Sequence, residues 1–105
     1  MSYRGSFTTE YIYDKDCFNI VKEVLSPYYW NIMTYKENII SGKIDDLSDI
    51  ILKIGFENRL EEISSEIKEK DSIRIILFGE TFTTYYKVSK DKVDIIYREE
   101  NDYYG

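Results

Sequence analysis

The chain has 105 residues, a formal net charge of −6, one cysteine and no histidine. Its length suits one domain with a core of its own, and the lone Cys17 excludes both an intramolecular disulfide and a zinc site built from several thiolates. The absence of histidine removes the usual general base and the usual transition-metal ligand. We therefore expect a single acidic domain over residues 1–105 that is not an enzyme and holds no cofactor or metal.

No run of about eighteen apolar residues is present, and the start Met1-Ser2-Tyr3-Arg4-Gly5 lacks the apolar stretch of a signal peptide. We expect a cytoplasmic protein without membrane attachment. Isoleucine, lysine, asparagine and tyrosine are abundant, whereas alanine and glutamine are missing. This usage is typical of an AT-rich genome, such as that of a low-GC bacterium or one of its phages.

The predicted elements begin with a strand over Gly5–Tyr13, in which Phe7, Thr9, Tyr11 and Tyr13 share one face. Asp14 and Asp16 are candidate N-caps of a helix that ends at Pro27. Its apolar stripe comprises Cys17, Phe18, Val21, Val24 and Leu25.

A hairpin is predicted next. Residues 28–35 alternate as a strand, Lys36–Asn38 form a turn, and residues 39–44 return as a strand that Ser41 and Gly42 interrupt.

The segment from Asp45 to Lys70 has helical periodicity, but its phase changes at Gly55. One apolar stripe contains Leu47, Ile50, Ile51 and Ile54, and a second, on the opposite side, contains Phe56, Leu60, Ile63 and Ile67. We predict two helices, over residues 46–54 and 57–70, with Gly55 as the C-cap of the first.

Three runs rich in β-branched and aromatic residues follow, over residues 72–79, 81–89 and 92–98. Short polar breaks separate them, which predicts a three-stranded antiparallel meander. The fold class is therefore α+β, an antiparallel sheet in β-α-β-β-α-α-β-β-β order with helices on one face. Its first six elements allow a ferredoxin-like β-α-β-β-α-β unit. Residues 99–105 are expected to form a flexible acidic, tyrosine-containing tail.

Negative charge is concentrated in two segments. Residues 45–71 contain nine acidic and four basic side chains, and residues 94–105 contain four and one. Such a surface repels nucleic-acid phosphates and membrane headgroups and favours a protein partner with a basic surface. The candidate partner-binding residues are Glu57, Glu61, Glu62, Glu66, Tyr103 and Tyr104. A solvated surface without a partner is the simpler interpretation.

Two groups of residues suggest chemistry. Asp45, Asp46 and Asp49 offer oxygen ligands for a divalent cation and resemble the D-D-x-x-D metal motif of terpene synthases, although they also suit an acidic first helical turn. Cys17 would be nucleophilic in a first helical turn, but it lies on the apolar stripe beside carboxylates, which indicates a core cysteine.

The sequence therefore favours a non-catalytic protein-binding module that inhibits or regulates a basic partner, with no direct nucleic-acid binding. In general character it is similar to phage-encoded inhibitors of host defence, anti-CRISPR proteins among them, and to toxin-immunity proteins. Two alternatives remain: an assembly subunit that buries tyrosines and strand edges in a homo-oligomer, and a small metal-dependent enzyme using the three aspartates.

Overall fold

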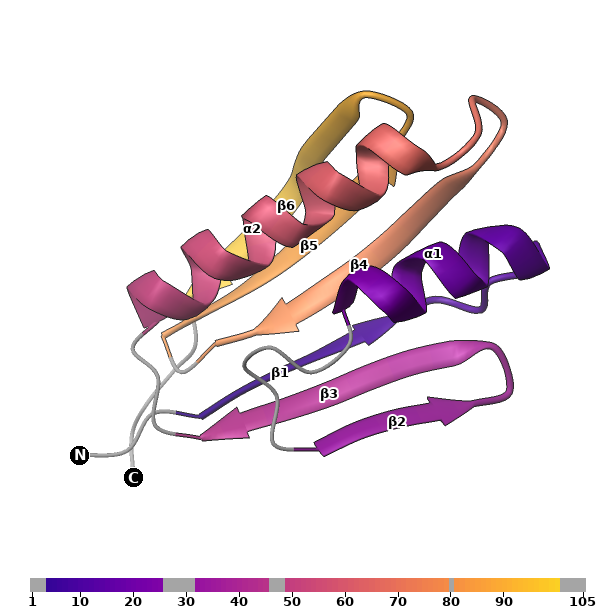
Figure 1. The fold of residues 1–105 in the computed structure, drawn as a ribbon. Coiled ribbons are helices and arrows are strands. Elements are labelled where there is room, and N and C mark those ends of the chain that lie inside the picture. The colour runs from indigo at the N-terminus through magenta and orange to yellow at the C-terminus, as the bar shows by residue number, and fades with distance from the viewer. Residues whose placement is uncertain (1–3, 26–31, 46–48, 80, 101–105) are drawn as a thin grey trace.

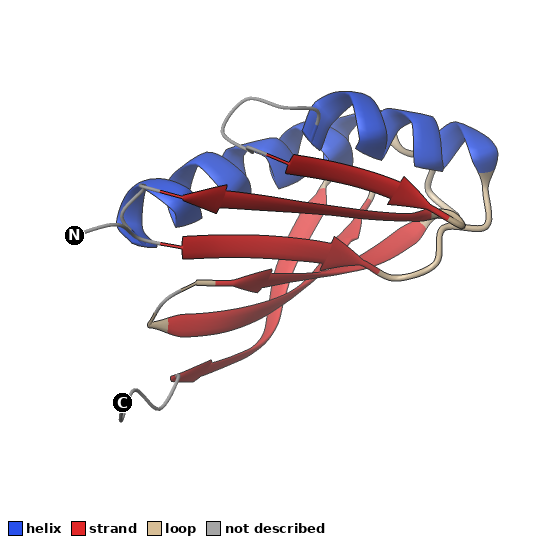
Figure 2. Ribbon diagram, turned by 90° about the horizontal axis from the view of Figure 1, so that it is seen from below, coloured by secondary structure: helices blue, strands red, loops and turns tan. Residues whose placement is uncertain are grey.

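The computed structural model describes residues 4–25, 32–45, 49–79 and 81–100 (Figure 1). Six strands form one antiparallel sheet, and both helices lie on the same face of it (Figure 2). The α+β class, the single helical layer and the C-terminal meander are thus confirmed. The elements are β1 (Arg4–Thr9), α1 (Lys15–Leu25), β2 (Ile32–Lys36), β3 (Ile39–Asp45), α2 (Asp49–Glu66), β4 (Ser72–Phe78), β5 (Phe82–Ser89) and β6 (Lys92–Glu100).

The strand order is β2-β3-β1-β4-β5-β6. In the unit β1-α1-β2, the strand β3 lies between the two strands of the unit. In the unit β3-α2-β4, the strand β1 lies between them. This is the split β-α-β arrangement of a ferredoxin-like unit, and it covers the first six elements. β5 and β6 extend the sheet beyond β4 as a meander, so that β2 and β6 are the two edges among the described strands.

β1 is shorter than predicted, and the expectation that the strand continues to Tyr13 is wrong. After Thr9 the chain leaves the ladder: the Glu10 amide still donates to the Arg74 carbonyl (3.0 Å), but the Ile12 amide donates to the carbonyl of Asn38 (3.0 Å). Ile12 is consequently buried, whereas Tyr13 is 87% exposed. A backbone partner 26 residues away decides where the strand ends.

The helix α1 begins at its predicted cap. The carboxylate of Asp14 accepts hydrogen bonds from the amides of Asp16 (2.8 Å) and Cys17 (3.2 Å), which satisfies two of the free donors of the first turn. The predicted apolar stripe faces the sheet: Cys17, Val21 and Leu25 are buried, and Phe18 and Val24 pack against them. Pro27 lies outside the described residues.

The hairpin of β2 and β3 turns at Glu37 and Asn38, whose φ angles are 51° and 64°. Two consecutive positive φ angles are typical of a type I′ turn, which matches the twist of the flanking strands. β3 is continuous through Ser41 and Gly42, so the predicted interruption is wrong. Gly42 pairs with Phe7 on one side and Met33 on the other. Of the predicted residues 28–35, those before Ile32 lie outside the described chain.

The segment before β4 forms one helix, α2, and the prediction of two helices is wrong. Gly55 lies inside α2, and no glycine of the described chain has a positive φ, so the predicted glycine cap is absent. The second predicted stripe is buried, whereas Ile54 of the first is 57% exposed. Glycine inside a helix costs about 1 kcal/mol relative to alanine, and burial of one large apolar side chain contributes about 1.5–3 kcal/mol. Packing of Phe56 and Leu60 therefore outweighs the local preference of Gly55.

The core lies between the helices and the sheet. The ring of Phe56 is 5.4 Å from that of Phe7 and 5.9 Å from that of Tyr86, measured between centroids, so α2 contacts both β1 and β5. The other large buried side chains are Leu25, Ile40, Leu60, Ile63, Ile67, Ile73, Ile75 and Val88. No helix in the described ranges is long and apolar enough to cross a membrane.

Candidate functional site

The predicted acidic residues of α2 do not form one face. Glu61, Glu62 and Glu66 are exposed, whereas Glu57 is partly buried. Glu57 and Glu66 are nine residues apart, which is two and a half turns at 3.6 residues per turn, so they lie on opposite flanks of the helix. Glu61 follows Glu57 by four residues and lies on the same flank, toward β5 and β6, but it is exposed, whereas Glu62 and Glu66 lie on the other side of the helix. Glu61, Glu62 and Glu66 all face solvent. We call Glu61, Glu62 and Glu66 the acidic surface of α2.

Glu57 is bound within the fold. Its carboxylate accepts a hydrogen bond from the Tyr86 hydroxyl (2.7 Å) and lies 3.9 Å from the guanidinium of Arg98, which also donates to the hydroxyl oxygen of Thr84 (3.2 Å). Burial raises the pKa of Tyr86, and the hydrogen bond to Glu57 raises it further. Glu57 therefore connects α2 to β5 and β6 and is not a free binding group.

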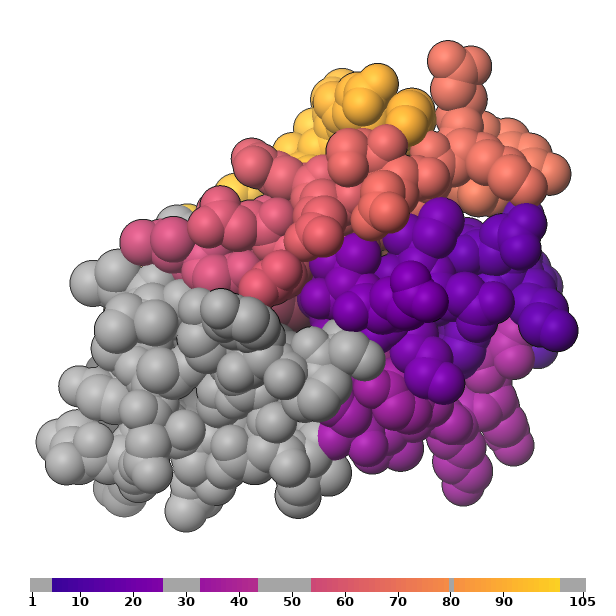
Figure 3. All heavy atoms as spheres, viewed as in Figure 1, coloured from indigo at the N-terminus to yellow at the C-terminus, as the bar shows by residue number. Residues whose placement is uncertain are grey.

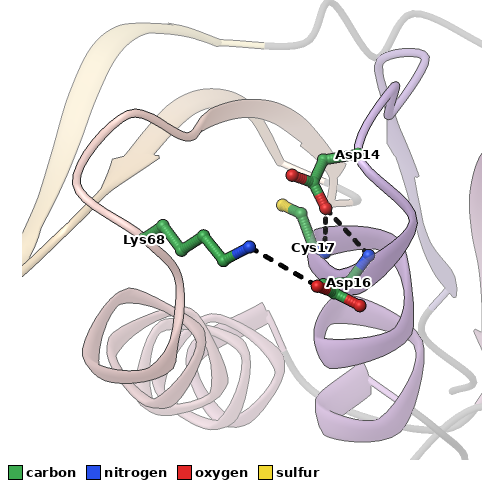
Figure 4. Close-up of polar contacts among 4 residues, drawn as sticks. All are labelled: Asp14, Asp16, Cys17 and Lys68. Carbon is green, nitrogen blue, oxygen red and sulfur yellow. Dashed lines mark hydrogen bonds and ion pairs between the residues drawn. The ribbon is translucent and has the colours of Figure 1, made fainter.

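Several cations near α2, among the described side chains, are engaged in contacts within the molecule. Arg59 pairs with Glu62 (3.1 Å), and Lys68, just beyond the helix, pairs with Asp16 of α1 (3.4 Å; Figure 4). Lys90 donates to the Ser65 carbonyl (2.5 Å) at the C-terminal end of α2. Among the described residues, no salt bridge is found for Glu61 or Glu66. The acidic surface therefore has a net negative charge, and α2, which carries it, lies on the face of the molecule shown in Figure 3.

Cys17 lies beside the cap of α1, where Figure 4 shows it close to Asp14. The hydrogen bond from the Cys17 amide holds the pKa of Asp14 below its usual value. Burial raises the pKa of the Cys17 thiol to about 12, and the carboxylates of Asp71 and Asp14 add to the increase. The thiolate form needed for nucleophilic attack is therefore strongly disfavoured at neutral pH. The interpretation as a core cysteine is confirmed by its burial.

The aspartates proposed as metal ligands fall around the start of α2. Asp45 is the last residue of β3 and Asp49 is the first residue of α2, while Asp46 lies outside the described residues. Within the described ranges, no group of three or more His, Cys, Asp and Glu side chains is placed to hold a metal ion. The metal-dependent alternative stays a hypothesis about these three residues.

The prediction of a flexible tail over residues 99–105 is wrong for its first two residues, and the rest of that range lies outside the described residues. Glu99 and Glu100 belong to β6, where they pair with Thr83 and Phe82 of β5. Tyr103 and Tyr104, the two tyrosines assigned to partner binding, lie outside the described residues.

Sequence reasoning missed the exposed apolar residues of β6. Ile95, Ile96 and Tyr97 are 51%, 53% and 57% exposed, and a β-bulge interrupts their pairing with β5 between Tyr85 and Tyr86. Ile95 pairs with Tyr86 and Tyr97 with Tyr85, which leaves Ile96 as the extra residue. Three consecutive apolar residues break the strict alternation of a half-buried strand. This break in the sequence pattern is the signal that could have indicated a bulge with exposed apolar side chains.

A shallow groove of about 410 Å³ crosses the sheet face opposite the helices. Its lining includes Thr8 and Arg74 from the central strands, and Tyr85, Ile96 and Tyr97 from the meander. The rings of Tyr85 and Tyr97 are 5.7 Å apart, and the Tyr85 hydroxyl donates to Glu99 (3.4 Å). Near the β6 edge, the sheet face that the helices leave uncovered (Figure 2) is thus lined by Tyr85, Ile96 and Tyr97.

Comparison with protein-family models, curated proteins and solved structures finds no match for this chain.

Proposed function

We propose that this protein is a non-catalytic, cytoplasmic protein-binding module that inhibits or regulates a partner with a basic surface, such as a nucleic-acid-handling protein. The observation that supports this most is the acidic surface of α2. Glu61 and Glu66 are exposed without a salt bridge to any described residue, while Lys68 and Lys90 are engaged elsewhere. The helix thus presents two carboxylates, Glu61 and Glu66, that no described side chain pairs with, while Glu62 is paired with Arg59.

The physical role of such a surface is to steer and select a partner. Complementary charge raises the rate of association and disfavours partners of like charge, and both effects weaken as salt screens the charges. With a net charge of −6, the whole molecule adds to the attraction of a basic protein and repels free nucleic acid.

Two features support a role other than catalysis. The chain has no histidine, and its single thiol has a pKa of about 12 in the buried environment of α1. Histidine therefore supplies no general base with a pKa near neutrality, and cysteine supplies no activated thiolate.

The proposal is tested with the double variant Glu61→Lys/Glu66→Lys and a matched control, Glu23→Lys/Glu37→Lys. Both variants change the net charge equally, but Glu23 is an exposed residue of α1 and Glu37 lies in the β2–β3 turn. Each protein is immobilised and exposed to lysate of the source cell at low and high salt, and captured proteins are identified by mass spectrometry.

We expect wild type and the control to capture the same basic protein, which is lost at high salt. The α2 variant should lose it even at low salt. Equal loss in both variants would show that net charge, not the acidic surface, determines capture. Capture that is insensitive to salt and to both variants would contradict the proposal.

A further inference from the structure

β6 is the longer of the two edge strands. It has nine residues, against five in β2, and it pairs with β5 on one side only among the described elements. It forms the rim of the sheet beyond α2 in Figure 1. An edge strand presents a row of unpaired N–H and C=O groups, which readily pair with another strand. β6 is therefore the edge with the greater capacity to accept a further strand.

The middle of this edge is apolar and its ends are charged. Ile95, Ile96 and Tyr97 are each about half exposed, and they are flanked by Lys92 and Asp94 before and by Arg98, Glu99 and Glu100 after. Natural edge strands are commonly protected by charged side chains along the edge and by bulges. Here the charges lie at the ends, where they leave the apolar centre open to contact.

We propose that two copies of this chain associate through β6, as antiparallel neighbours related by a two-fold axis, so that one sheet runs through both. The inference does not rest on the proposed function, because self-association needs no other partner. In a two-fold antiparallel pair the start of one strand lies beside the end of the other. Lys92 of each copy therefore lies near the acidic end, Glu99 and Glu100, of the second copy.

The β-bulge restricts the register of this pairing. Paired residues of β5 and β6 point to the same face of the sheet. The helix-facing side includes Val93 and Arg98, which pair with the buried Val88 and Thr84. The opposite side includes Asp94 and Glu99, which pair with Lys87 and Thr83. Opposite residues of paired strands must lie on the same face. Ile96 is the extra residue of the bulge, so it shifts the alternation of faces by one residue along β6. Two registers therefore place the apolar residues at the centre of the pairing and keep opposite residues on the same face, both before and after the bulge.

Charge distinguishes these two registers. The register centred between Ile95 and Ile96 places Lys92 opposite Glu99 of the second copy, and Asp94 opposite Tyr97. The register centred between Ile96 and Tyr97 places Asp94 opposite Glu99, which are like charges. The side chain of Lys92 is 67% exposed although its nitrogen lies 3.7 Å from Asp94 of its own strand, so it can also contact a second carboxylate. The first register is favoured because opposite charges attract across neighbouring strands.

Sedimentation velocity over a concentration series tests the association. Wild type should move from the 12.6 kDa monomer toward twice that mass as concentration rises. Ile96→Lys places a charge at the centre of the edge and should weaken the dimer at least about tenfold. The control is Ile54→Lys, which changes a similarly exposed isoleucine (57%) on α2 and should leave the dimer unchanged. Ile96→Thr, which keeps the β propensity, replaces Ile96→Lys if circular dichroism shows that the lysine variant is unfolded.

The register is tested by exchanging the charges. Lys92→Glu and Glu99→Lys should each weaken the dimer about tenfold, and the double variant Lys92→Glu/Glu99→Lys should restore it, because each pair is then reversed rather than broken. A monomer at every concentration, or a dimer indifferent to Ile96→Lys and Ile96→Thr, would overturn the proposal. A double variant that associates no better than the single ones would overturn the register.

Discussion

Glu57 shows how one residue of an acidic helix differs from its neighbours. In sequence it is equivalent to Glu61, Glu62 and Glu66, but in the fold it accepts a hydrogen bond from Tyr86 and lies near Arg98. A charge-reversed Glu57 would leave the Tyr86 hydroxyl without its acceptor and Arg98 beside a like charge. Loss of binding in such a variant would report instability as well as recognition, so Glu61 and Glu66 are the informative positions.

We predict that Tyr86→Phe lowers stability by about 1.5 kcal/mol at neutral pH, since it removes a hydrogen bond to a charged group. The pKa of Tyr86 is raised above its ordinary value of 10.0, so the folded protein retains the phenolic proton longer than the unfolded chain. This contribution is complete below pH 10 and is lost as pH rises through the raised pKa. The difference between wild type and variant should therefore shrink at alkaline pH.

Urea denaturation at neutral pH and at several values above pH 10 measures both effects. Tyr13→Phe, which changes an exposed ring, serves as the control and should not alter stability at neutral pH. A Tyr86→Phe variant as stable as wild type would show that the hydroxyl contributes nothing to the fold.

At the scale of an element, α2 depends on tertiary packing more than on its own sequence. Its buried side contains Phe56, Leu60 and Ile63, while Gly55 and the exposed Ile54 contribute little to the core. Most helical stability in proteins comes from packing of an apolar face rather than from intrinsic propensity. The helix therefore continues through a glycine that, in sequence, indicates its end.

We predict that Gly55→Ala stabilises the protein by up to about 1 kcal/mol, because alanine suits a helix interior and restricts the unfolded chain. Asp91→Ala is the contrasting variant and should destabilise the protein. Asp91 has a φ of 58°, and alanine is less favourable than aspartate in this left-handed conformation because it lacks a short polar side chain that can hydrogen-bond locally. Thermal and urea unfolding of both variants measures the changes. Destabilisation by Gly55→Ala would indicate a positive φ at Gly55 and a helix that is broken there.

At the scale of the whole molecule, the strand order determines which parts of the sheet are protected. β1 and β4 lie in the centre, and β2 and β6 have one unpaired side among the described elements. Local opening is easiest where few contacts oppose it. The edges of the sheet are therefore expected to open before its centre.

We predict that amide protons of β1 and β4 exchange most slowly with solvent, and that β6 becomes more protected as protein concentration rises. The second effect follows from pairing of β6 with a second copy, which would bond its outward N–H groups. Hydrogen exchange followed by mass spectrometry at two concentrations measures both. Protection of β6 that is equal to that of β4 at high dilution would contradict the expected order.

The two proposed surfaces are compatible in one molecule. Both copies joined at β6 have their helices on the same side of the continuous sheet, because the two-fold axis is perpendicular to it. Two acidic surfaces then face the same direction and can engage one partner with two basic sites. Such a bivalent contact strengthens binding without any new residue contact.

Much of the fold was predictable because its causes are local. Runs rich in β-branched and aromatic residues identified β4 and β5, the spacing of Cys17, Val21 and Leu25 identified the buried side of α1, and the carboxylate of Asp14 identified its first turn. The candidate site was predictable only as a group of carboxylates. Which of them is free depends on Tyr86 and Arg98, which follow Glu57 by 29 and 41 residues.

The sequence by itself thus determined the elements of the meander, the first helix and the acidic character of the surface, since each depends on neighbours within a few residues. Only the tertiary structure decided that β3 separates β1 from β2, that α2 continues through Gly55, and that β6 forms an edge. These features depend on backbone pairing and side-chain packing between distant segments. Their free energy exceeds the local preferences at Gly55 and at the end of β1, so the distant contacts prevail.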